Sequence, residues 1–90
     1  MSERVRFKLP ERNEVRGVED DVALAIFTAE CIYGRPQTRM EVSYATGLDG
    51  RTCVLDVNGP AGESAVRVLV GLFEARFGEA RFAVERGARP

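Results

Sequence analysis

The order in which two hydrophobic periodicities follow each other constrains the fold of this chain more than any other feature. Period-two alternation, typical of half-buried strands, occurs in four stretches: 4–9, 39–44, 52–57 and 81–85. Longer amphipathic stretches, typical of helices, lie at 21–33 and 62–77. The resulting order of strand, helix, strand, strand, helix, strand predicts an α+β fold.

This order also predicts a topology. Two βαβ halves that share a hairpin form a two-layer βαββαβ (ferredoxin-like) sandwich, in which a four-stranded antiparallel sheet carries both helices on one face. Right-handed crossovers then place the first and third strands at the centre of the sheet. The 90 residues suit a single domain over 1–90, and we expect an ordered core at about 4–86 and a loose tail at 87–90.

Local signals predict where the elements begin and end. The carboxylates at 19–21 favour a helix start near residue 21, so we expect residues 10–19 to form a polar loop. Gly34 suits the position after the helix, and Pro36 prevents its continuation. The turn at 47–50 should join the second and third strands as a hairpin. A strand at 23–27 is the alternative to the first helix.

Charge and composition exclude several classes of protein. Thirteen basic and fourteen acidic residues give a net charge of −1, so nucleic-acid binding, which needs a basic surplus, is disfavoured. Lys8 is the only lysine among these basic residues, which indicates a compositional bias of the genome, and we expect a bacterial source. The third strand also lacks the stacking aromatic residues of RNA-recognition sheets.

The two cysteines, Cys31 and Cys53, are too few for a disulfide framework, so we expect reduced thiols and a cytoplasmic location. The first residues are charged, and no apolar run approaches the ~20 residues that span a membrane. We therefore expect neither a signal peptide nor a membrane partner.

No constellation of catalytic residues is visible in the sequence. The chain has no histidine, and its carboxylates and cysteines do not follow the spacing of metal ligands. Gly59–Gly62 precedes the second helix but lacks the lysine of a phosphate loop, so an ordinary turn is the better interpretation. We expect no enzyme activity, no metal and no cofactor.

The first predicted helix has two apolar sides. One side should pack on the sheet: Val22, Ala25, Ile26, Ala29, Ile32 and Tyr33. The other side carries Leu24, Phe27 and Cys31, which we call the apolar strip. Surface apolar clusters of this kind mark interfaces, and we expect a homo-oligomer or another protein partner here. The alternatives are that the loop at 10–18 covers the strip, or that the phase of the predicted helix is wrong.

The first strand has a basic side. If Val5, Phe7 and Leu9 face the helices, then Arg4, Arg6 and Lys8 line the open face of the sheet. This basic row suggests an anion-binding site, with an ordinary solvated strand face as the alternative.

Two segments resemble known families. Residues 15–18 (VRGV) resemble the phosphate loop of the acylphosphatases, but carboxylates at 19–21 stand where those enzymes have a phosphate-binding arginine, so we expect no such activity. Residues 54–79 resemble the last strand and last helix of the phosphocarrier HPr family, and the first strand and helix extend the likeness to about half of the chain. That family carries a phosphorylated histidine at the start of its first helix, and this chain has no histidine, so we expect no phosphocarrier role.

Taken together, the sequence predicts a small non-enzymatic interaction or regulatory domain that self-associates through the apolar strip. The first alternative is a domain that senses an anionic metabolite through the basic row. Nucleic-acid binding through the same row is the less favoured alternative.

Overall fold

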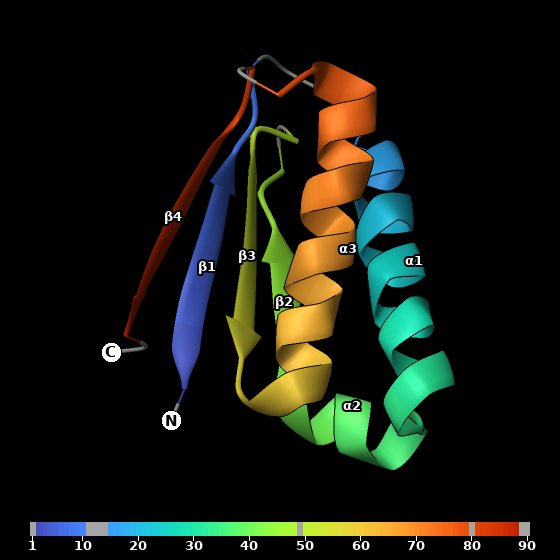
Figure 1. Ribbon diagram of the computed structural model, residues 1–90. Coiled ribbons are helices and arrows are strands. Elements are labelled where there is room, and N and C mark those ends of the chain that lie inside the picture. Colours follow the sequence, from blue (N-terminus) through green and yellow to red (C-terminus); the bar gives the residue numbers. More distant parts are fainter. Residues whose placement is uncertain (1, 11–14, 49, 80, 89–90) are drawn as a thin grey trace.

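The computed structural model describes residues 2–10, 15–48, 50–79 and 81–88, and shows one sheet with helices on one face (Figure 1). The elements are β1 Glu3–Lys8, α1 Val15–Tyr33, α2 Arg35–Glu41, β2 Val42–Thr46, β3 Thr52–Val57, α3 Gly59–Phe77 and β4 Ala83–Ala88. The strands lie in the order β2-β3-β1-β4, and all neighbours are antiparallel. The predicted α+β sandwich and the central position of the first and third strands are confirmed.

The alternation in β1 and β3 sorts side chains between the two faces of the sheet. Val5 pairs with Leu55 and Phe7 with Cys53, and all four side chains are fully buried beneath the helices. The core is completed by residues of both long helices: Val18, Val22, Ala25, Val66, Leu69 and Phe73. The sequence predicted both features: burial of alternate residues on one face of the sheet, and burial of one side of each long helix.

Aromatic rings close the core at the end of α3. The ring centroid of Phe73 lies 5.3 Å from that of Phe7, 5.6 Å from that of Phe77 and 5.9 Å from that of Phe82. Its contacts with Phe7 and Phe82 are edge-to-face, which is a favourable arrangement of ring quadrupoles. Phe73 therefore links the sheet, α3 and the segment that leads into β4.

Two polar contacts fix α1 and α3 as antiparallel neighbours. Near the start of α1, both carboxylate oxygens of Asp21 accept hydrogen bonds from Arg76, near the end of α3, at 2.7 and 2.9 Å. At the other end, the Ser64 hydroxyl donates to the Tyr33 hydroxyl at 3.4 Å. The ion pair raises the pKa of Arg76, mainly through its hydrogen bond to Asp21. Because Asp21 is only 8% exposed, its charge needs this partner.

The first helix begins earlier than the sequence indicated. It starts at Val15, so the predicted loop at 10–19 is wrong for 15–19, and the alternative strand at 23–27 is also wrong. The carboxylates at 19–21 suggested a helix start, but Asp21 serves instead as the partner of Arg76. Val18, one turn before Val22, is buried in the core and extends the packed face of the helix.

The stretch expected to open the second strand is a helix. Residues 39–41 belong to α2, and β2 begins only at Val42. α1 ends at Tyr33, before Gly34 with its φ of +88°, and Pro36 occupies the first turn of α2, where proline costs no hydrogen bond. The Thr38 hydroxyl, fully buried, donates to the Gly34 carbonyl at 2.9 Å and stabilises this short helix. Met40, one of the apolar residues whose alternation indicated a strand, is 80% exposed.

Two other predicted boundaries differ from those of the structure. α3 begins at Gly59 instead of Gly62, with Pro60 in its first turn. The expected tail at 87–90 is wrong for residues 87 and 88, because Gly87 and Ala88 pair with β1 in β4. Residues 89 and 90 lie outside the described residues.

Two glycines of α3 give a matched test of the packing. A Cβ on Gly62 would lie 2.8 Å from both the Glu41 carbonyl oxygen and Val57 Cβ, whereas a Cβ on Gly71 would meet nothing within 4 Å. We expect Gly62→Ala to lower the free energy of unfolding by about 1–3 kcal/mol through overpacking. Gly71→Ala should raise it by about 0.5–1 kcal/mol, because alanine is the better helix former. Urea unfolding checks both, and equal effects of the two would contradict the packing.

Candidate functional site: the outer face of α1

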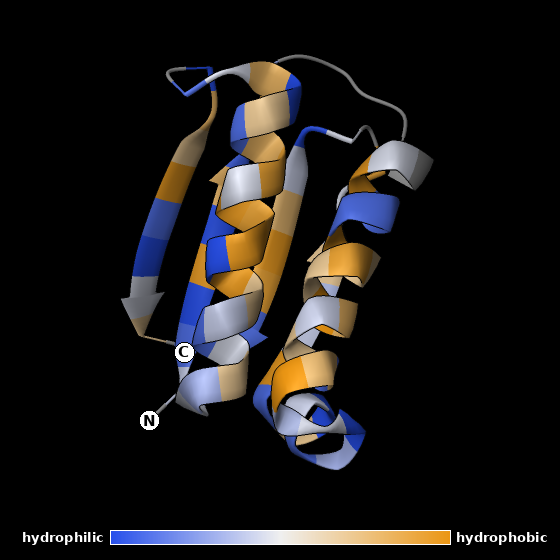
Figure 2. Cartoon of the chain, turned by 45° about the vertical axis from the view of Figure 1, so that its right-hand side comes forward, coloured by the Kyte–Doolittle hydropathy of each residue, from blue (hydrophilic) through white to orange (hydrophobic). Residues whose placement is uncertain are grey.

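The apolar strip lies on the surface of the helix layer. Leu24 is 49% exposed, Phe27 is 59% exposed, and Cys31 is also exposed. In Figure 2, α1 at the right carries orange segments along its length, below a blue stretch near its start. Sequence reasoning therefore located these three side chains correctly as outside the core of the single chain.

Helix geometry explains this exposure. The buried residues Val22, Ala25 and Ala29 face the sheet and α3. At about 100° per residue, Phe27 and Cys31 point to the opposite side of the same helix. Of the segment expected to cover them, residues 15–18 are part of α1 and Val18 lies in the core. Residues 11–14 lie outside the described residues.

Ile32 is exposed on another side of α1 than the strip, which corrects the prediction that it packs on the sheet. It is 64% exposed, because the buried side of α1 is centred on Val22 and Ala29 and Ile32 lies at its rim, in the last turn. Tyr33, also predicted to pack on the sheet, is only partly buried. Ile32 lies about 140° around α1 from Phe27, so it is not part of the apolar strip. The exposed parts of Leu24 and Phe27 alone amount to on the order of 200 Å².

Opposite charges flank the apolar strip. Asp20 is exposed near the start of α1. Arg35 follows the last turn of α1 with 68% of its side chain exposed, and its Nε lies 3.8 Å from Glu30 Oε2. Asp20 thus lies about two helical turns before Phe27, and Arg35 lies just beyond the other end of α1, in the first turn of α2.

The basic row lies on the open face of the sheet, as predicted, but most of its charge is paired. Arg4 donates to both carboxylate oxygens of Asp56 at 2.8 and 3.2 Å, and Lys8 Nζ lies 3.2 Å from Glu85 Oε2. The bond to Asp56 raises the pKa of Arg4. Among the described residues, Arg6 makes no ion pair. An anion would therefore compete with two carboxylates for this row.

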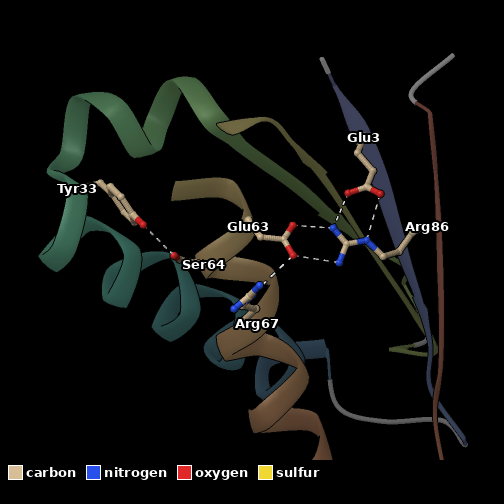
Figure 3. A network of polar contacts seen from close by, with 6 residues as sticks. All are labelled: Glu3, Tyr33, Glu63, Ser64, Arg67 and Arg86. Carbon is tan, nitrogen blue, oxygen red and sulfur yellow. Dashed lines mark hydrogen bonds and ion pairs between the residues drawn. The ribbon is translucent and has the colours of Figure 1, made fainter. Parts of the chain in front are cut away.

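A second ion-pair network, which sequence reasoning missed, joins the sheet to α3. The Arg86 guanidinium on β4 donates to Glu3 on β1 and to Glu63 on α3, with the shortest bond to each at 2.5 and 2.7 Å (Figure 3). The hydrogen bond from Arg86 lowers the pKa of Glu3, and the two carboxylates raise the pKa of Arg86. This arrangement ties the edge strand to the domain and leaves no open cationic site at Arg86.

The start of α3 is occupied by a carboxylate from the chain itself. Glu41, the last residue of α2, accepts a hydrogen bond from the Ala61 backbone N–H at 2.7 Å through its Oε1. A Cβ on Gly59 would lie only 2.5 Å from this carboxylate, so glycine at φ +69° makes room for it. Glu41 complements the positive end of the helix dipole. The segment Gly59–Gly62 is thus a capped helix start, and a phosphate would have to displace Glu41.

The two thiols differ in accessibility. Cys31 is exposed, whereas Cys53 is fully buried in β3, and burial raises its pKa to about 12. Because the thiolate is the reactive form, we expect one equivalent of fast reaction with a thiol reagent in the native protein and two after denaturation. Cys31→Ser should abolish the fast phase. Two fast equivalents in the native protein would contradict the burial of Cys53.

In the part of the chain that the structure describes, no cluster of three or more Asp, Glu or Cys side chains could hold a metal ion, and no helix is long and apolar enough to cross a membrane. No protein-family model matches the chain, and no curated protein matches it either. The outer face of α1 is therefore the candidate site.

Proposed function

We propose that this chain is a small non-enzymatic interaction domain that associates with a second copy of itself through the apolar strip. The observation that supports this proposal is the exposure of Leu24, Phe27 and Cys31 on one side of α1. The opposite side of the same helix already fills the core. Covering this apolar surface would gain on the order of 25 cal/mol per Å² before the costs of association.

The size of the domain supports the same proposal. A chain of this length buries only about 60–65% of its unfolded surface, so a partner subunit adds stability that a small core does not supply. We place the domain in the cytoplasm, because an exposed thiol such as Cys31 suits a reducing compartment.

The oligomeric state tests the proposal. Sedimentation velocity of the wild-type protein over a wide concentration range should show a reversible transition from monomer to dimer. A monomer at every concentration would contradict self-association. A fixed larger assembly that persists on dilution would also contradict it, because a strip of this size supports only a weak, reversible interface.

Sensing of an anionic metabolite has less support. Arg4 and Lys8 are each held by a carboxylate on a neighbouring strand. An anionic ligand would have to bind Arg4 or Lys8 more strongly than these carboxylates already do. A nucleic-acid interface on this face meets the same obstacle.

A further inference from the structure

The proposed self-association has a direction that the surface of α1 itself specifies. A symmetric dimer uses the same patch on both copies, so the patch must complement itself when turned by 180°. Leu24 and Cys31 lie on either side of Phe27, at three and four residues along α1. A two-fold axis that passes close to Phe27 therefore exchanges the positions of Leu24 and Cys31.

We infer, resting on the proposed function, that the two copies of α1 cross in an antiparallel sense about a two-fold axis beside Phe27. Each Leu24 then packs against the second copy's Cys31. At 1.5 Å per residue, residues 24 and 31 lie about 5 Å from the axis, on opposite sides of it, so the two contacts form at once.

Charge at the ends of the apolar strip selects this direction. In the antiparallel arrangement, Asp20 of one copy approaches Arg35 of the other, and this happens twice by symmetry. A parallel arrangement would place Asp20 against Asp20 and Arg35 against Arg35. Arg35 is largely exposed and is only loosely paired, at 3.8 Å from Glu30, so it is free to reach a second carboxylate. Charge pairs of this kind fix the register of an interface and exclude the like-charged alternative.

Among the described residues at the proposed contact between the two copies, burial would leave no polar side chain without a hydrogen-bond partner. Thr28 follows Phe27, and its hydroxyl already donates to the Leu24 carbonyl oxygen at 2.8 Å within the same helix. Its methyl group can therefore enter the contact without an unmet hydrogen bond. The strip offers on the order of 200 Å² of apolar surface per copy, which is below the ~800 Å² of a standard interface and sets the expectation of a weak, reversible dimer.

Disulfide trapping tests the direction. We expect Leu24→Cys, with native Cys31 retained, to form an intermolecular disulfide between position 24 and the second copy's Cys31 under mild oxidation. The wild-type protein should not cross-link efficiently, because two Cys31 residues would lie about 10 Å apart along the axis, beyond disulfide reach. Leu48→Cys is the matched control and should not cross-link. Leu48 is 98% exposed and lies outside the strip.

A charge exchange gives a second readout. Asp20→Arg should weaken dimerisation about tenfold, and Asp20→Arg combined with Arg35→Asp should restore it, as measured by sedimentation. Melting curves of the variants check that the monomer remains folded.

The outcomes separate the two proposals. A wild-type dimer that cross-links through Cys31 alone, or a charge exchange that fails to restore association, overturns the antiparallel arrangement and leaves self-association standing. A wild-type monomer overturns both.

Discussion

Phe27→Asp is expected to convert the dimer into a monomer, raising Kd at least about 100-fold, while the melting temperature of the monomer changes by no more than a few degrees. In the single chain, Phe27 is 59% exposed and contributes little to the core, so aspartate replaces it at low cost. In the dimer, the same carboxylate would lose its water against Phe27 or Leu24 of the second copy without gaining a partner, which costs several kcal/mol. Sedimentation and thermal unfolding measure the two effects separately.

Leu48→Asp is the matched control for this prediction. It introduces the same charge at an apolar residue that is even more exposed, at 98%, in the turn between β2 and β3. Its Kd should equal that of the wild type. If Leu48→Asp dissociates the dimer as strongly as Phe27→Asp does, the effect is one of net charge, and the strip is not the interface.

Phe73→Ala should cause the largest loss of stability of the substitutions considered, about 3–5 kcal/mol in the free energy of unfolding. Its side chain is fully buried, and its ring contacts those of Phe7, Phe77 and Phe82. Truncation therefore removes the transfer free energy of the ring, its aromatic contacts and the filling of the space between them. For a domain of this size such a loss approaches the whole stability, so the variant should be partly unfolded at room temperature.

Urea unfolding followed by circular dichroism measures this loss, in a stabilising osmolyte if the variant does not fold otherwise. Phe82→Ala is the control within the same cluster, since Phe82 is only partly buried and should cost clearly less. A loss below about 1 kcal/mol for Phe73→Ala would show that the cluster is not packed as the contacts indicate.

Much of the fold could be predicted from the sequence because the decisive signals are local. Alternation in β1 identifies Val5 and Phe7 as core and Arg4 and Arg6 as open face without reference to any other segment. The exposure of Leu24 and Phe27 was predictable for the same reason, since the angle between side chains along a helix depends only on their separation. What the strip contacts remains a prediction.

The errors share a different cause. The strand predicted from residue 39 is wrong for residues 39–41, which belong to α2. Met40, Val42 and Tyr44 alternate, and helix propensity over the seven residues of α2 is too weak to override that pattern. In the structure, α2 is stabilised by contacts with distant residues, which the local sequence does not indicate. Glu41 reaches across twenty positions to the start of α3, and Asn58 N–H donates to the Glu41 carbonyl.

Apart from α2, the order of the elements follows from the sequence alone, as do most of the residues that enter the core and the presence of an apolar strip outside it. These properties follow from the periodic spacing of apolar residues, which depends only on residues close together in the sequence. The pairing of charges, in contrast, depends on the folded chain: Asp21 pairs with Arg76, 55 residues away, and Glu3 with Arg86, 83 residues away. Any arginine can pair with any carboxylate within reach, so the choice depends on how the helices and strands come together in space.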